Sequence, residues 1–163
     1  MDEGELWCVM EALLELVSAL KQHELGVNLK LDEVFITLKG LPCIYPYHLM
    51  SYEESLNCSE QGMGELVARI VLQLANGTTL PAHTTRQDEG KDLLAPLARL
   101  CSRHRLLGKM VKQLLNREQT EEQILEEISQ QVASKRIVKA NEIKLNRFKY
   151  MIPDLPRPEQ SPK

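Results

Sequence analysis

The chain has 163 residues and a net charge of −3, with 43% hydrophobic and 26% charged residues, which is an ordinary globular balance. No apolar run approaches the roughly 18 residues of a membrane span, and the acidic start lacks the positive region of a secretory signal. We therefore expect a protein without membrane contact, located in the nucleus or, alternatively, in the cytoplasm. Only 4% of the residues are aromatic, so aliphatic side chains must build the core.

The N-terminal part of the chain, residues 1–90, predicts a small α+β head. Its first element is an amphipathic helix over residues 5–23, because apolar side chains recur there every three or four positions. Gly26 follows the last of these side chains and is the expected end of the helix. The apolar stripe consists of Leu6, Met10, Leu13, Val17 and Leu20.

Strands are expected next. Residues 27–31 and 34–38 alternate apolar and polar side chains, which is the pattern of half-buried strands. The alternation changes phase at residues 32–33, and this change predicts a bulge or a tight turn. Residues 43–47 continue as a strand at the edge of the sheet, because Pro46 has no N–H group for a central ladder.

The rest of the head consists of two expected loops around one ambiguous segment. Residues 51–64 and 76–91 are polar, contain glycines and are typical of loops. Residues 65–75 fit the spacing of a helix and also the alternation of a strand. We favour the helix, which places Leu66 and Ile70 on one face.

Residues 91–134 predict one long amphipathic helix or a helical hairpin. Pro96 suits the first turn of a helix, where no backbone donor is needed. Twelve positions along this segment then follow heptad steps, and nine of them are apolar, as in the seam of a coiled coil. Thr120 and Gln123 fit a capping box, which would start a second helix instead.

The expected fold is therefore α+β, with an N-terminal helix, a small antiparallel sheet and a long, coiled-coil-like C-terminal helix or helical hairpin. Residues 135–163 are expected to form a basic, Pro-rich and partly disordered tail, in which residues 135–150 extend the helix weakly. The seam predicts a helix interface, which includes the possibility of a homodimer. Its candidate residues are Leu97, Leu100, His104, Leu107, Val111, Leu114, Leu125, Ile128 and Val132.

Charge is distributed unevenly along the predicted long helix. Six basic residues and no acidic one lie between Leu93 and Arg117, and five glutamates follow from Glu118 to Glu127. This polarity suits antiparallel pairing of helices or contact with a phosphate backbone, and a solvated face is the alternative. No aromatic residue interleaves with the basic ones, so contact with nucleic acid would lack sequence preference. The candidate contacts to DNA or to an acidic partner are Arg99, Arg103, Arg105, Lys109, Lys112, Lys135, Arg136, Lys139, Lys144, Arg147 and Lys149.

The sequence contains no pattern that points to catalysis or to metal binding. His23, His48, His83 and His104 do not pair at the spacing of metal ligands. Cys101 and His104 lie three residues apart on one predicted helix, whereas a reactive pair usually comes from separate elements. His104 lies on the seam, where polar residues often set the register of packed helices. We therefore expect a protein that is not an enzyme and has no cofactor.

Two segments of the chain carry a resemblance to a known family. The passage 29–49 contains Gly40-Leu41-Pro42, followed by Tyr45, Tyr47 and His48. The stretch Leu93-Leu94-Ala95-Pro96-Leu97 runs into the long helix through Val111, Leu114 and Leu115. Together these segments cover about half of the chain and resemble the Cernunnos-type end-joining factors (XLF). The resemblance implies a nuclear scaffold for joining DNA double-strand breaks, which dimerises through its helix, binds DNA without sequence preference and contacts a related head domain.

The predicted function is that of a non-catalytic scaffold or adaptor that assembles with other protein subunits through its long helix. The resemblance implies DNA double-strand-break end joining as its setting. The alternative is a structural subunit of a mitotic assembly, at the kinetochore or the centrosome, without direct DNA binding.

Overall fold

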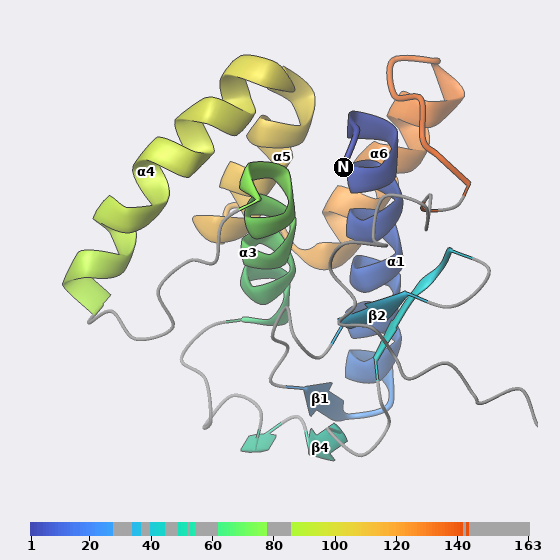
Figure 1. Cartoon of the computed structure of the whole chain (residues 1–163). Helices are drawn as coiled ribbons and strands as arrows, with labels where there is room; N and C mark the ends of the chain where they lie inside the picture. Colours follow the sequence, from blue (N-terminus) through green and yellow to red (C-terminus); the bar gives the residue numbers. More distant parts are fainter. Residues whose placement is uncertain are drawn as a thin grey trace, which may run out of the picture.

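The fold is mostly helical in the computed structural model, which describes residues 1–27, 34–36, 40–44, 49–51, 53–54, 62–77, 86–141 and 143. Helices α1, α3, α5 and α6 pack around one core, and α4 lies at the edge of this bundle (Figure 1). The helices are α1 (Glu3–Gln22), α3 (Met63–Asn76), α4 (Arg86–Arg103), α5 (Arg105–Leu115) and α6 (Glu121–Ala133).

The predicted α+β fold with a small antiparallel sheet is wrong. The strands that the structure describes have three residues each and form two separate antiparallel pairs, β1 with β4 and β2 with β3. Such short pairs cannot bury a core face of their own, and helical side chains supply almost all of the core instead. The predicted phase change at residues 32–33 and the continuation over residues 45–47 lie outside the described residues. The strands are β1 (Leu25–Val27), β2 (Val34–Ile36), β3 (Pro42–Ile44) and β4 (Leu49–Ser51).

Helix α1 confirms the amphipathic helix expected over residues 5–23. The Asp2 carboxylate accepts the backbone N–H of Glu5, and the Glu5 carboxylate accepts the N–H of Asp2, so a reciprocal capping box starts the helix. The helix ends at Gln22 and not near Gly26. Glu24, just after the helix, takes the left-handed conformation with φ of 56°, and Gly26 lies in β1.

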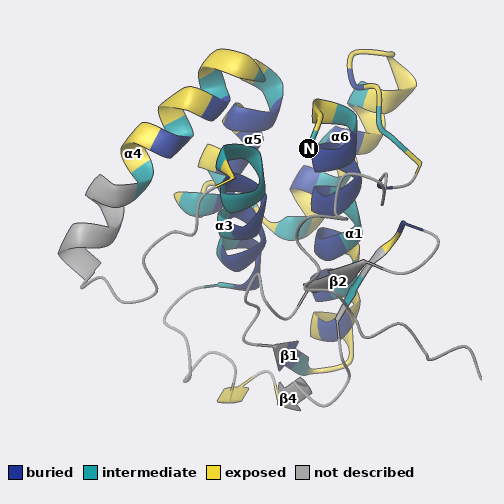
Figure 2. Ribbon diagram, in the orientation of Figure 1, coloured by how far each residue is buried: buried dark blue, intermediate teal, exposed yellow. Residues whose placement is uncertain are grey.

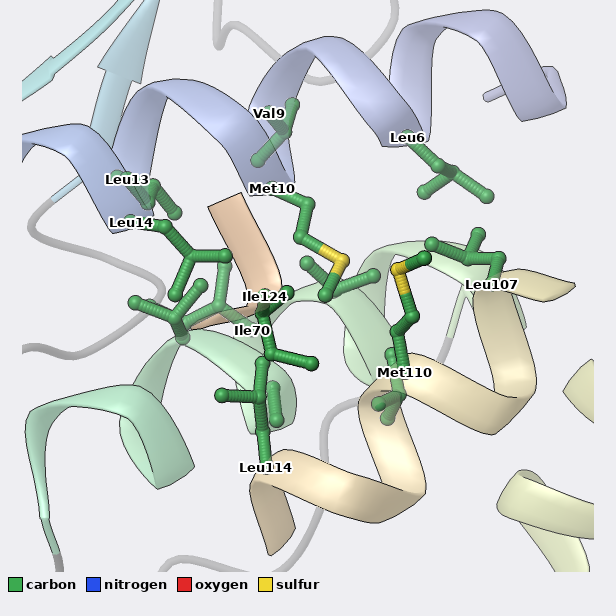
Figure 3. Packing of buried hydrophobic residues seen from close by; sticks show 14 of the residues in the cluster. Leu6, Val9, Met10, Leu13, Leu14, Ile70, Leu107, Met110, Leu114 and Ile124 are labelled. Atoms are coloured by element: carbon green, nitrogen blue, oxygen red, sulfur yellow. The ribbon is translucent and has the colours of Figure 1, made fainter. Parts of the chain in front are cut away.

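The core forms where α1 meets α3, α5 and α6. Figure 3 shows Met10, Leu14, Ile70 and Ile124 converging from α1, α3 and α6. Burying a large aliphatic side chain of this kind contributes about 1.5–3 kcal/mol. Burial follows the helix faces that look toward this centre, while the outer faces are exposed (Figure 2). Helix α3 confirms that residues 65–75 are helical.

The predicted long helix is divided into three, so neither one helix nor a two-helix hairpin describes it. Helix α4 begins at Arg86, within a segment expected to be a loop, and Pro96 lies inside it rather than in its first turn. The chain leaves helical geometry at His104, with φ of −136° and ψ of 80°, and turns into α5. A second break precedes α6, where the Thr120 and Gln123 capping box is confirmed.

The described residues after α6 pack across the N-terminal half of the molecule and do not form the weak helix expected from residue 135 onward, whereas residues 144–150 of that expected helix lie outside the described part of the chain. Ile137 and Ile143 are buried in the core. The N–H of Ala140 donates to the carbonyl of Gly4 at 3.0 Å, and the N–H of Ile143 donates to the carbonyl of Gly40 at 2.9 Å. We call residues 134–143 the C-terminal strap.

Helix α6 supplies the cap that α3 lacks in its own sequence. Gly62 at the N-cap of α3 has no side chain to accept a backbone N–H, and Glu121 Oε1 accepts the N–H of Gly64 at 3.0 Å. A carboxylate at this position also interacts favourably with the positive end of the helix dipole. We expect Glu121→Ala to lower the free energy of unfolding by about 1 kcal/mol, measured by urea denaturation.

The matched control for this prediction is Glu126→Ala, on the exposed face of the same helix. It should change the free energy of unfolding by less than about 0.5 kcal/mol. Equal effects of the two substitutions would show that the contact with Gly64 does not stabilise the fold.

Candidate nucleic-acid interface

Five basic side chains form two exposed stripes on consecutive helices. Arg99 and Arg103 lie one helical turn apart on α4, and Arg105, Lys109 and Lys112 follow at helical spacing on α5. All five residues are exposed. We call these five residues the α4–α5 basic surface. The two stripes lie on helices that are joined end to end through the turn at His104.

Most of this positive charge is not neutralised within the part of the chain that the structure describes. Lys109 Nζ lies 3.7 Å from Glu127 Oε1, which is a loose ion pair at an exposed position. Arg99, Arg103, Arg105 and Lys112 form no ion pair with any described residue. Their charges are therefore available to an anionic partner.

The remaining predicted contacts lie after α6 and divide into three groups. Lys135 and Arg136 are exposed at the start of the C-terminal strap. Lys139 instead pairs with Glu11 of α1, with Nζ and Oε2 2.9 Å apart. Three residues lie outside the described part of the chain, namely Lys144, Arg147 and Lys149.

The candidate helix interface lies largely in the core of the chain itself. Five of its residues are buried there, and Leu97, His104 and Leu125 are half-buried. Val132 is at the boundary of exposure, at 36%. A dimer through the buried residues would require α4, α5 and α6 to separate from the core. The five buried residues are Leu100, Leu107, Val111, Leu114 and Ile128.

The described histidines, His23 and His104, and Cys101 make contacts that hold helix ends together. His104 Nδ1 lies 3.1 Å from Glu3 Oε2, an interaction that joins the start of α1 to the α4–α5 turn. Cys101 packs against Gly108 across this turn. His23 caps the end of α1 through its backbone N–H. The candidates His48 and His83 lie outside the described residues.

Among the described residues, pKa values are shifted at Cys8, Glu15 and Glu122, and the first two of these share the charged neighbours Glu11 and Lys139. Burial raises the pKa of the Cys8 thiol. Burial, with the neighbouring charge of Glu11, also raises the pKa of the Glu15 carboxyl. Burial opposes ionisation of Glu122, but hydrogen bonds from its own backbone and from Ser18 outweigh it and lower the pKa. Among the described residues, no group of histidine, cysteine, aspartate and glutamate side chains could hold a metal ion.

A small cavity adjoins the α4–α5 basic surface. It has a volume of about 50 Å³ and lies between the start of α1, the end of α3 and the last turns of α4. The pattern of charge in the sequence predicts its basic residues, but nothing local to Leu6 or Asn76 indicates that α1 and α3 reach α4 there. The lining residues are Met1, Leu6, Ala75, Asn76, Arg99, Leu100, Arg103 and His104.

Comparisons with known proteins find no relative of this chain. No family model, no curated protein and no solved structure matches the chain. Within the described residues, no helix is long and apolar enough to span a bilayer.

Proposed function

We propose that this protein is a non-catalytic scaffold that binds duplex DNA in double-strand-break end joining. One observation carries the proposal: Arg99, Arg103, Arg105 and Lys112 are exposed on adjoining helices and form no ion pair with any described residue. Lysine and arginine side chains in this state bind a phosphate backbone, because contact releases counterions from the DNA.

The character of the surface indicates the mode of binding. Its members are lysines and arginines only, without an aromatic side chain between them on which a base could stack. Phosphate contacts position a protein on DNA but do not read the sequence. The proposed binding is therefore independent of DNA sequence. Lys135 and Arg136 of the C-terminal strap, both exposed, are additional candidate contacts.

The setting in end joining rests on the resemblance of two segments to the Cernunnos-type factors. These segments are residues 29–49 and the stretch Leu93-Leu94-Ala95-Pro96-Leu97 with its continuation into α5. A nuclear location and assembly with other protein subunits belong to the same proposal. Self-association is also part of it, and sedimentation of the intact chain at several concentrations would test that element separately.

Binding to fluorescein-labelled duplex DNA is the direct test, measured by anisotropy over a series of salt concentrations. If four phosphates are contacted, affinity should fall by about 150-fold between about 50 and 200 mM salt. Replacing Arg99, Arg103, Arg105 and Lys112 together by glutamine should weaken binding by at least about tenfold at low salt and flatten the salt dependence.

Lys21→Gln is the control, because Lys21 is exposed near the opposite end of α1, about 27 Å along the helix from Glu3. This substitution should change the affinity for DNA by less than about twofold. That result would show that binding depends on where a positive charge lies and not only on the net charge of the protein. No binding by the wild type at low ionic strength would refute the proposal. That result would favour a structural subunit without direct DNA contact.

A further inference from the structure

We propose that the cavity beside the α4–α5 basic surface is a binding site for a single phosphate group. This inference rests on the proposed DNA binding and specifies where one phosphate would be held. The cavity of about 50 Å³ has room for about three to five waters, and a tetrahedral phosphate is of that size. A nucleobase or a whole nucleotide is too large for it.

The polar groups at the mouth of the cavity are donors that suit an anion. Arg99 and Arg103 extend from successive turns of α4, and both line the cavity. Arg99 Nε donates to the carbonyl of Ala95 at 3.4 Å, and its terminal NH₂ groups make no hydrogen bond with any described residue. Guanidinium groups bind phosphate oxygens through parallel, charge-assisted hydrogen bonds. Arg103 lies in the last turn of α4, where a positive charge interacts favourably with the helix dipole. Arg99 lies one turn earlier, where this interaction does not explain a basic residue.

Leu6, Leu100 and Asn76, which also line the cavity, are packed or hydrogen-bonded within the protein. Leu6 and Leu100 are buried and form its apolar floor. Asn76 Nδ2 donates to the carbonyl of Leu72 at 2.8 Å and to the carbonyl of Pro96 at 3.4 Å, which fixes the end of α3 against α4. The walls are therefore preorganised, and binding an anion would not require them to move.

One acidic side chain, Glu3, lies nearby, and it contacts His104, which lines the cavity, and Trp7. Glu3 Oε2 lies 3.1 Å from His104 Nδ1, and Glu3 Oε1 accepts the indole N–H of Trp7 at 3.3 Å. Glu3 does not line the cavity. A bound phosphate would therefore face the two guanidinium groups and the imidazole rather than this carboxylate.

Inorganic phosphate is the probe for the test, titrated into the ¹⁵N-labelled chain against chloride at constant ionic strength. We expect saturable NMR shifts at Asn76, Arg99 and Arg103. The double variant Arg99→Gln with Arg103→Gln should bind phosphate at least about tenfold more weakly. The matched control, Arg105→Gln with Lys112→Gln, removes the same charge from the same surface outside the cavity and should retain the affinity within about twofold.

Duplexes with 5′-phosphate and 5′-hydroxyl ends identify the source of the phosphate. A preference for the phosphorylated ends, lost in the cavity variant, would place an end phosphate in the cavity, and equal affinity would place an internal one there. Shifts that do not saturate, or equal losses in both double variants, would overturn the cavity proposal while leaving DNA binding intact. Saturable phosphate binding without any duplex binding would instead refute the proposed function and retain the site.

Discussion

Gly108→Ala should destabilise the protein, although glycine to alanine inside a helix ordinarily stabilises by up to about 1 kcal/mol. A Cβ atom at residue 108 would lie 2.7 Å from both the Cα and the Sγ of Cys101, and 2.9 Å from its backbone N. Two of these three contacts are with the backbone, so the two helices must move apart to admit a methyl group. Overpacking of this kind costs about 1–3 kcal/mol. We expect a net loss of about 2 kcal/mol, measured by urea denaturation.

Two control variants make this prediction specific. Gly62→Ala should have an effect below about 1 kcal/mol, because a Cβ atom at residue 62 meets no atom within 4 Å. Cys101→Ala, combined with Gly108→Ala, should not restore stability, since it removes Sγ but leaves the clash with the backbone. A stabilised Gly108→Ala protein would show that α4 and α5 are not closely packed at this turn.

Leu107→Asp should unfold the chain. Leu107 is fully buried in the core formed by α1, α3 and α5, and its side chain lies beside Leu6 and Met110 (Figure 3). The substitution removes the apolar contacts, leaves a cavity and places a carboxyl group among aliphatic side chains. We expect a loss of about 4 kcal/mol or more, against a total stability of about 5–15 kcal/mol for a domain. Circular dichroism during thermal denaturation would show the loss of a cooperative transition.

The matched control is Leu94→Asp on α4, where the side chain is 64% exposed. This change should cost less than about 1 kcal/mol, which reflects helix propensity alone. The comparison also tests self-association. If Leu107 lay in the seam of a dimer, Leu107→Asp would give a folded monomer. Recovery of such a monomer would contradict the burial of Leu107 within its own chain.

Local signals in the sequence are sufficient to predict several of the helices. The apolar stripe of α1 and the spacing of α3 depend on residues a few positions apart, as does the capping box of Thr120 and Gln123. Each of these signals concerns side chains that meet within one or two helical turns. They can therefore be recognised without knowledge of the rest of the fold.

The break at His104 has no comparable signal. His104 makes no side-chain cap, and no proline or glycine lies within three residues of it. The apolar seam continues through it, because a helix that packs on its own domain needs the same spacing as one that packs on a partner. The α+β prediction failed for a similar reason. Alternating residues after α1 indicated strands, but did not limit their length to three residues. The phosphate cavity draws on three helices that are distant in sequence, and so only its basic residues could be predicted.

The C-terminal strap has a consequence for how the chain is made on the ribosome. Helix α1 is synthesised before two of its partners, α6 and the strap, whose Ala140 bonds to Gly4. At about 5–20 residues per second, about 6–24 s separate the synthesis of Gln22 from that of Ile143. During this interval the apolar face of α1 lacks its final cover. The nascent chain should therefore be a ligand for chaperones that bind exposed hydrophobic helices, and release should require the last third of the sequence.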